Sequence, residues 1–101
     1  MLARVELCVY PPLSYKMSSK RTGALILEQE IGPGETLGDL LARLENGDHE
    51  TWHDIFDAQT SQMQPPILTV LNGTLLSRSV APQTPLSEGD QIDLRIAYAG
   101  G

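Results

Sequence analysis

The stretch GPGETLGDLLARLENG, residues 32–47, restricts the fold more than any other part of the sequence. Four leucines take the i, i+3, i+4 and i+7 positions of one helical face: Leu37, Leu40, Leu41 and Leu44. Thr36 predicts the N-cap, Asp39 stands where a capping box usually has Glu or Gln, and Asn46-Gly47 predicts the end of the helix. Because such a helix must bury its apolar face, the remaining chain has to supply a partner layer.

The flanking segments predict that this layer is a β-sheet. Strand patterns occur in residues 3–10, 24–31, 67–76 and 91–98. The first and last of these alternate between apolar and polar side chains, which is typical of half-buried strands. The third contains Asn72-Gly73 between two apolar runs, a strong signal for a β-hairpin. Residues 49–59 place Trp52, Ile55 and Phe56 at helical spacing and predict a short second helix.

The predicted order is therefore strand, strand, helix, short helix, strand, strand, strand. The chain has 101 residues, 41% of them hydrophobic, which is the size of one domain. We expect a single domain over residues 1–101 with an α+β fold. The arrangement that satisfies both patterns is the β-grasp, or ubiquitin-like, fold. In it a mixed sheet packs on the main helix, and the first and last strands are adjacent at its centre.

The charge of the chain restricts its partners. The formal net charge is −6, whereas nucleic acids and anionic membranes are bound by basic surfaces. We therefore expect no nucleic acid and no membrane among the partners. The N-terminus lacks the apolar core of a signal peptide, and no segment has the roughly 20 apolar residues of a membrane span. The single cysteine, Cys8, excludes an intrachain disulfide framework, so the sequence favours a soluble, cytoplasmic protein.

Three motifs occur in the order found in one known family. They are the hairpin VLNGTLL, the turn and strand PLSEGDQIDL, and the terminal AGG. On these motifs the sequence resembles the ThiS/MoaD family of small β-grasp sulfur carriers, which includes the small subunit of molybdopterin synthase. The resemblance covers nearly the whole chain and is most distinctive from Ile67 onward. Residues 11–23 and 47–66 are longer than in a minimal family member, so the pathway stays open.

The terminal residues suit a particular chemistry. A carboxylate is a poor electrophile, so reaction at its carbon requires activation, commonly as an acyl-adenylate made from ATP in a site that excludes water. A tail of Ala99, Gly100 and Gly101 can enter a narrow site because it carries almost no side chain. We expect this tail, residues 99–101, to be flexible, and the strand ending at Tyr98 to present it. The resemblance implies that Gly101 is adenylated and then carries sulfur as a thiocarboxylate.

The resemblance further implies a carrier protein, not an enzyme, with no catalytic residues and no bound cofactor of its own. Its partners are an E1-like adenylating enzyme that uses ATP, a sulfur donor such as a cysteine desulfurase or rhodanese, and an acceptor synthase. By resemblance the acceptor is the large subunit of molybdopterin synthase, in molybdenum or tungsten cofactor synthesis. Three alternatives stay open: a ubiquitin-like modifier of lysines, a sulfur carrier for thiamine, cysteine or another metabolite, and a non-covalent β-grasp binding module.

Other residues with reactive, metal-binding or charged side chains are expected to have structural roles. His49 and His53 are four residues apart among acidic neighbours, as in some zinc sites. The sequence nevertheless favours two exposed histidines on a solvated acidic helix, so we expect no metal site and no histidine-based hydrolase. Cys8 lies mid-strand, which predicts a packed thiol, and Trp52 is expected to anchor the short helix. A solvated loop is expected to hold the basic side chains of Lys16, Lys20 and Arg21.

Overall fold

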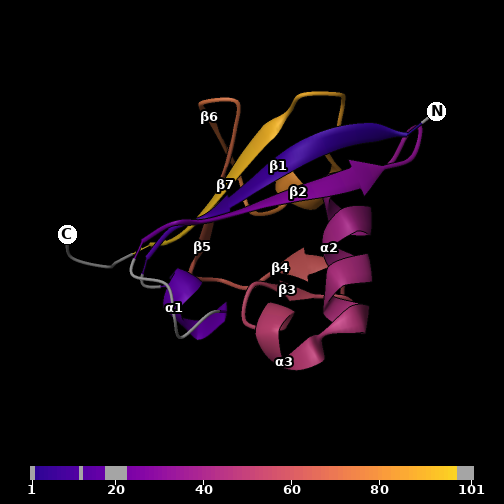
Figure 1. Cartoon of the computed structure of the whole chain (residues 1–101). Coiled ribbons are helices and arrows are strands. Elements are labelled where there is room, and N and C mark those ends of the chain that lie inside the picture. Colours follow the sequence, from indigo (N-terminus) through magenta and orange to yellow (C-terminus); the bar gives the residue numbers. More distant parts are fainter. Residues whose placement is uncertain (1, 12, 18–22, 98–101) are drawn as a thin grey trace.

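The computed structural model describes residues 2–11, 13–17 and 23–97. Its centre is a five-stranded sheet in the order β2-β1-β7-β5-β6. The strands are β1 (Ala3–Val9), β2 (Leu25–Ile31), β5 (Ile67–Leu71), β6 (Thr74–Leu76) and β7 (Gln91–Ile96). β1 and β7 pair in parallel at the centre, and the other neighbouring strands pair antiparallel. The main helix, α2 (Leu37–Gly47), lies against one face of this sheet (Figure 1). This is the mixed β-grasp sheet that the sequence predicts.

The inner face of the sheet and α2 enclose one apolar core. Its fully or almost fully buried members include Leu7, Val9, Ile92 and Leu94 from the strands and Leu37, Leu40 and Leu41 from the helix. The register places Leu7 opposite Ile92 and Val9 opposite Leu94, so the two central strands present matching inward pairs. Leu44 is only partly buried against this core. The period-two strands and the period-3.6 helix thus bury the faces that their patterns predict.

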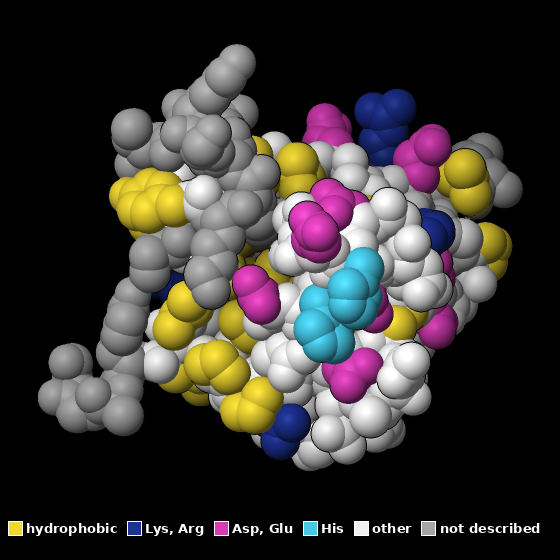
Figure 2. All heavy atoms as spheres, turned by 90° about the horizontal axis from the view of Figure 1, so that it is seen from below, with side chains coloured by type: hydrophobic (Ala, Val, Ile, Leu, Met, Phe, Trp, Pro, Cys, Tyr) yellow, Lys and Arg dark blue, Asp and Glu magenta, His cyan; other side chains and the backbone are white. Residues whose placement is uncertain are grey.

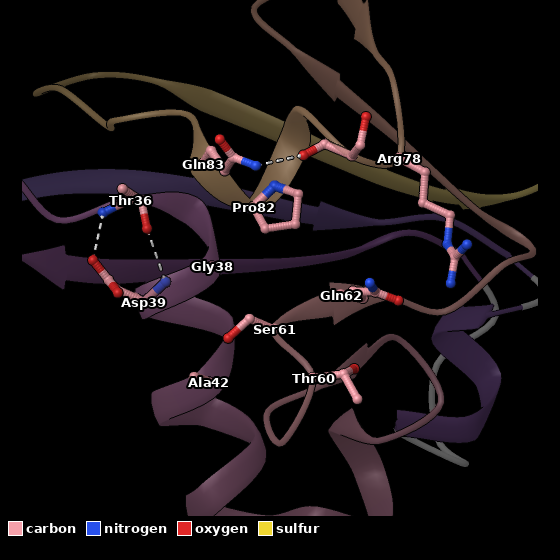
Figure 3. A pocket seen from close by; sticks show the side chains of 11 residues that line it. Thr36, Gly38, Asp39, Ala42, Thr60, Ser61, Gln62, Arg78, Pro82 and Gln83 are labelled. Atoms are coloured by element: carbon pink, nitrogen blue, oxygen red, sulfur yellow. Dashed lines mark hydrogen bonds between the residues drawn. The ribbon is translucent and has the colours of Figure 1, made fainter.

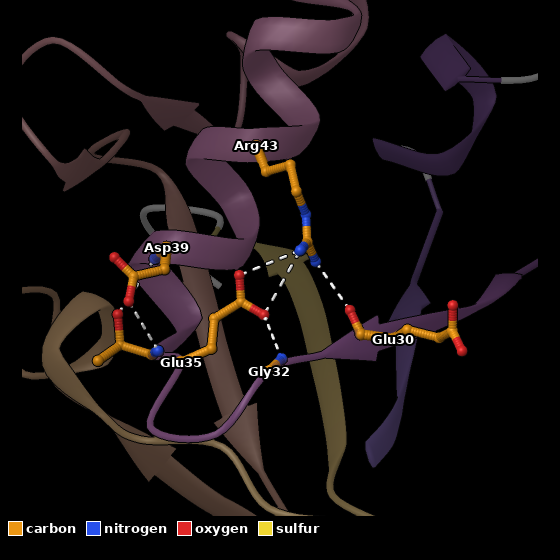
Figure 4. Close-up of polar contacts among 6 residues, drawn as sticks. Glu30, Gly32, Glu35, Asp39 and Arg43 are labelled. Atoms are coloured by element: carbon orange, nitrogen blue, oxygen red, sulfur yellow. Dashed lines mark hydrogen bonds and ion pairs between the residues drawn. The ribbon is translucent and has the colours of Figure 1, made fainter. Parts of the chain in front are cut away.

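Hydrogen bonds fix the start of α2 and tie it to β2. The Thr36 hydroxyl accepts from the Asp39 N–H at 3.1 Å, and the Asp39 carboxylate accepts from the Thr36 N–H at 3.0 Å, which completes the predicted capping box. Arg43 donates to the carbonyl of Glu30 at 2.8 Å and pairs with the Glu35 carboxylate at 3.1 Å (Figure 4). The helix is therefore held at its N-terminus and along its side.

β5 and β6 form the hairpin predicted from Asn72-Gly73. Both turn residues have positive φ, 49° and 86°, as a type I′ turn requires. The turn also contacts the start of β7, because the Asn72 N–H donates to the Gln91 carbonyl and its side-chain amide donates to the Asp90 carboxylate, each at 2.9 Å. These bonds hold the hairpin in register with the central strand.

The segment between α2 and β5 contains the predicted short second helix but differs from the prediction in the extent of that helix. The second helix, α3 (His49–Trp52), has only four residues. Phe56 begins β3 (Phe56–Asp57), which pairs with β4 (Gln62–Met63) in a separate two-stranded sheet. Trp52, Ile55 and Phe56 are all buried. Their helical spacing therefore reflects three separate insertions into one core and not one continuous helix.

Two connections contain short helices. α1 (Leu13–Met17) lies within residues 11–23, where the sequence predicts a loop. Its Leu13 is buried, and the Ser14 hydroxyl donates to the Gly23 carbonyl at 2.9 Å. Tertiary packing can order a helix too short to be stable alone. A 3₁₀ turn, η1 (Ala81–Gln83), lies between β6 and β7.

The side chains of Lys16, Lys20 and Arg21, which the sequence predicts in a solvated loop, lie outside the described part of the chain. None of the helices in the described ranges is long and apolar enough to cross a bilayer.

Candidate functional site

The predicted attachment site follows the end of β7. The four residues assigned to it lie outside the described residues: Tyr98, Ala99, Gly100 and Gly101. The predicted flexibility of residues 99–101 also concerns these undescribed residues and stays a prediction. β7 ends at Ile96, and Ala97 is the last described residue before this site. The structure therefore describes the base of the tail.

This base is held from both sides. The register of β7 with β5 continues to the last residue of β7, and the Ala97 N–H donates to the Pro66 carbonyl at 2.7 Å. On the other side, the Tyr10 N–H donates to the Leu94 carbonyl at 3.0 Å. Backbone bonds hold both edges of the strand up to Leu94, and the edge next to β5 is held as far as Ala97. A strand held in this way is a firm support for a reactive terminus.

The outer face of the sheet, on the side away from α2, is partly apolar. One row of paired residues crosses all five strands: Ile26, Cys8, Asp93, Val70 and Leu75. The two ends of this row are 56% and 61% exposed. Nearer the end of β7, the exposed Leu68 lies opposite Arg95, whose guanidinium carbon is 4.1 Å from the centre of the Tyr10 ring. Exposed apolar side chains beside the base of the tail are suited to contact with another protein.

Cys8 lies between Ile26 and Asp93 in the outer row and is only 3% exposed, which confirms the predicted packed thiol. Its burial raises the pKa of the thiol to about 11, and the carboxylates of Glu6 and Asp93 add to the shift. The thiol donates to the Glu6 carboxylate across 3.6 Å. Because the thiolate is the reactive form, Cys8 is unsuited to nucleophilic chemistry at neutral pH.

A groove of about 600 Å³ lies between the start of α2, the turn that joins β3 to β4, and η1 (Figure 3). Residues 60–62 line part of the groove, and Arg78, which also lines it, donates to the Met63 carbonyl at 2.9 Å. A Cβ on Gly38 would lie 2.7 Å from the Pro82 carbonyl oxygen, so glycine permits the close approach of α2 to η1. The lining residues come from neither β7 nor β1, which separates this groove from the base of the tail.

Glu45 joins the two histidines in a cluster that was not predicted from the sequence. Ligand atoms of Glu45, His49 and His53 lie within 4.8 Å of one another. Figure 2 shows the two imidazole rings together on the surface with acidic side chains around them. His49 is exposed as predicted, but His53 is half-buried. Glu45 lies four residues before His49, and this spacing was the available signal.

The stretch from His49 to His53 also has the complete H-E-x-x-H order, which is typical of zinc-binding helices. α3 is shorter than such a helix, and His53 is its C-cap. Glu50, the acidic residue of the motif, is exposed. Trp52 is 5% exposed and anchors α3 in the core, as predicted.

Glu45 is the charged member of this cluster that the fold buries. Its side chain is 6% exposed although it belongs to a surface helix. The Ala58 N–H donates to one carboxylate oxygen at 2.9 Å, and Nδ1 of His49 contacts the other. The Ala58 hydrogen bond, followed by the His49 contact, holds the pKa of the Glu45 carboxyl below its usual range. A buried carboxylate is thus kept ionised beside two imidazoles.

No family model and no curated protein matches the sequence, but several solved structures match the fold. The HVO 2177 protein of Haloferax volcanii is 18% identical over 99% of this chain and 88% of its own, with a TM-score of 0.73. SAMP1 of the same organism is 17% identical over 98% and 100%, with a TM-score of 0.69. Small archaeal modifier protein 1 of Methanosarcina acetivorans is 22% identical over 100% and 99%, with a TM-score of 0.67. At these identities the likeness establishes the fold, a ubiquitin-like β-grasp.

Proposed function

We propose that this protein is a β-grasp carrier whose Gly101 carboxylate is activated as an acyl-adenylate and then holds sulfur as a thiocarboxylate. The observation that carries the proposal is the placement of β7. This central strand is held by β1 and Tyr10 up to Leu94 and on the β5 side up to Ala97, and the slender tail follows it in the sequence. Two further points support the proposal: the resemblance to ThiS/MoaD carriers, and neighbours of the same fold that include small archaeal modifier proteins.

The reaction requires two steps at one carbon. In the first step, a carboxylate oxygen of Gly101 attacks the α-phosphorus of ATP, and pyrophosphate leaves. In the second step, a sulfur nucleophile attacks the acyl carbon and AMP leaves, so that a C–S bond replaces a C–O bond. The partner supplies the ATP site and excludes water from the adenylate. This chain contributes position and reach, because Gly100 and Ala99 let the carboxylate enter a narrow site.

We place the activating enzyme on the outer face of the sheet near the end of β7. Leu68 is exposed there on β5, and on the adjacent strand β7 Arg95 stacks on the ring of Tyr10. An enzyme docked on these residues needs to reach only a few residues beyond Ala97 to meet the carboxylate. Because the activating enzyme supplies the ATP site, the chain itself needs no catalytic residue and no bound cofactor.

The sulfur donor and acceptor follow from the resemblance. A cysteine desulfurase or rhodanese would supply the sulfur as a persulfide, which forms an acyl disulfide that a thiol then reduces to the thiocarboxylate. The large subunit of molybdopterin synthase would accept this sulfur. The thiocarboxylate is a soft nucleophile, which suits it to transfer sulfur to an electrophilic precursor. We place all of these partners in the cytoplasm together with the carrier.

The test is the mass of the protein after activation. The full chain is incubated with Mg-ATP, sulfide and the E1-like enzyme encoded by the same genome. The mass of the intact protein is then measured. We expect a gain that matches replacement of one carboxylate oxygen by sulfur. A variant with one serine added after Gly101 should show no gain, because the reactive group must be terminal. Conversion of the untrimmed extended chain to the same extent would contradict the proposal.

A ubiquitin-like modifier is the second candidate, and the modifier proteins among the structural neighbours are the observation that favours it. Both functions begin with the same adenylate, so they separate only afterwards. In the modifier, a target lysine amine attacks the activated carbonyl and an isopeptide bond forms. Denaturing electrophoresis of an N-terminally tagged chain expressed in its own host distinguishes the two. A ladder of larger species that disappears when Gly101 is deleted would support conjugation.

A further inference from the structure

The cluster of Glu45, His49 and His53 stands apart from the base of the tail and plays no part in the proposed function. The three residues come from separate positions around one break in the chain. Glu45 lies in the last part of α2, His49 begins α3, and His53 caps its C-terminus. Asp48 forms the break, with φ −149° and ψ 80°, and acts as C-cap of α2 and N-cap of α3. The turn at Asp48 therefore brings side chains from two helices to one point.

The carboxylate of this cluster is fixed in place. One oxygen of Glu45 accepts from the Ala58 N–H at 2.9 Å, and the other faces Nδ1 of His49. A carboxylate has further acceptor capacity on each oxygen. Because the side chain is almost entirely buried, little water can reach this anion. A cation at the face turned toward the histidines would balance its charge.

The imidazole of His53 gives a second reason to expect a bound ion, in addition to the fixed carboxylate. Its Nδ1 is enclosed and has no hydrogen-bond partner among the described residues. Buried polar atoms are nearly always paired, and an unpaired one in a native structure calls for an ion, a water or a functional role. The backbone around it is well held, since the His53 carbonyl accepts from the Gln64 side chain at 2.8 Å and its N–H donates to the His49 carbonyl at 2.9 Å.

We propose that Glu45, His49 and His53 form a binding site for one divalent ion of the zinc class. Zinc takes imidazole nitrogen at about 2.0–2.1 Å and carboxylate oxygen at about 2.0–2.2 Å, so tetrahedral ligand atoms lie about 3.4 Å apart. The three donors already lie within 4.8 Å of one another, and the two imidazole rings are stacked with their centroids 4.5 Å apart. Binding would require the side chains to rotate until the donors are about 3.4 Å apart. Two nitrogens and one oxygen suit zinc better than the hard ions Mg²⁺ and Ca²⁺, which prefer all-oxygen sites.

The surroundings of the cluster favour a cation with an open coordination position. A cavity of about 540 Å³ adjoins it, lined also by Asn46 and Asp57. The His49 side chain is exposed, and Figure 2 shows both rings at the surface. A bound ion would therefore keep contact with solvent or with a fourth donor. It would also fasten α3 and the segment after it to α2, which is a structural role in the least regular part of the fold.

The experiment is a metal titration of the full, untagged chain after metal has been stripped from it. Zn²⁺ is added in a calorimeter, and Co²⁺ is added in a spectrophotometer, where a tetrahedral site gives strong visible absorption. We expect one equivalent of Zn²⁺ to bind, one equivalent of Co²⁺ to give that absorption, and Mg²⁺ to give no comparable heat. Bound zinc should also raise the melting temperature, because it binds only the folded chain.

Two variants test the histidine ligands, and a third variant is the control. His49→Gln and His53→Gln should each weaken zinc binding by at least about 10–100-fold, since even residues that only support a ligand cost that much when lost. Glu50→Gln is the matched control, because this exposed acidic residue of α3 lies outside the cluster; it should bind as the unchanged chain does. Circular dichroism checks that each variant is folded. Absence of stoichiometric zinc binding, or a His53→Gln variant that binds zinc as well as the unchanged chain, would overturn the site. Activation of Gly101 is measured in a separate assay, and its outcome does not bear on the metal site.

Discussion

The sheet with α2 and the segment of residues 48–66 both bury large apolar side chains, but they do so by different means. In the first region, long elements present core residues at one repeat, so that Leu7, Ile92 and Leu41 belong to continuous faces. In the second, a four-residue helix and two two-residue strands each present one buried side chain: Trp52, Phe56 and Met63. The first region owes its shape to periodicity, and the second owes its shape to individual contacts.

These contacts are long-range and mostly involve backbone groups. The Gln64 N–H donates to the Ile55 carbonyl at 2.8 Å, and Arg78 donates to the Met63 carbonyl at 2.9 Å. Ala58 is held by the Glu45 carboxylate. The bonds from Arg78 and Glu45 tie the segment to residues outside it, and the bond between Gln64 and Ile55 closes the segment on itself. The difference between the regions teaches that an irregular segment can be as much a part of the core as a strand.

The largest effect on stability should come from the irregular segment. Phe56 has no exposed surface, so Phe56→Ala should lower the free energy of unfolding by about 3–5 kcal/mol. Urea unfolding measures this loss. Leu75→Ala is the control, because that side chain is 61% exposed. A loss below about 0.5 kcal/mol, as at surface positions, would show that residues 48–66 are peripheral and would break the comparison.

Leu41→Ala tests the regular region in the same assay. Leu41 is fully buried between α2 and the sheet, and its truncation should cost about 2–5 kcal/mol. If the two regions form one core, the slope of unfolding against urea should stay the same in both variants. A Leu41→Ala loss near zero would mean that α2 does not pack on the sheet as described.

Thr36→Ala should have the smallest effect of the three. It removes the hydroxyl that accepts from the Asp39 N–H, and the loss of such a cap costs about 0.5–2 kcal/mol. Thr36→Ser is the matched variant, since it keeps the hydroxyl and should retain most of the stability. Equal losses in the two variants would show that the capping box adds nothing and that α2 is held by packing alone.

The same contrast explains what the sequence could predict. Alternation in β1 and β7, the leucine stripe of α2 and the Asn72-Gly73 turn are local signals, and each of them predicted its element correctly. β3, β4 and the short length of α3 have no such signal, because they depend on partners such as Arg78 and Gln64. The cluster at Glu45 was missed for a related reason. Glu45 follows the leucine stripe, where a polar residue predicts solvent, and only the turn at Asp48 brings it to the histidines.

The base of the tail was predicted in part. The alternating pattern of residues 91–98 predicted a strand ending near the tail, and β7 occupies residues 91–96. The bond from Ala97 to Pro66 could not be predicted, because it depends on how the loop before β5 is placed. The residues assigned to the chemistry, Tyr98 to Gly101, stay a prediction.

Activation of the Gly101 carboxylate can be measured at its first step, adenylation. ATP–pyrophosphate exchange is measured with the E1-like enzyme and either the full chain or a chain lacking Gly101. The deletion moves the carboxylate back by about 3.3–3.6 Å, and a misplacement of about 1 Å can cost a hundredfold in rate. We predict at least about a hundredfold loss of exchange with an unchanged urea unfolding curve, while Glu50→Gln exchanges normally. Exchange at the full rate by the chain without Gly101 would contradict the account.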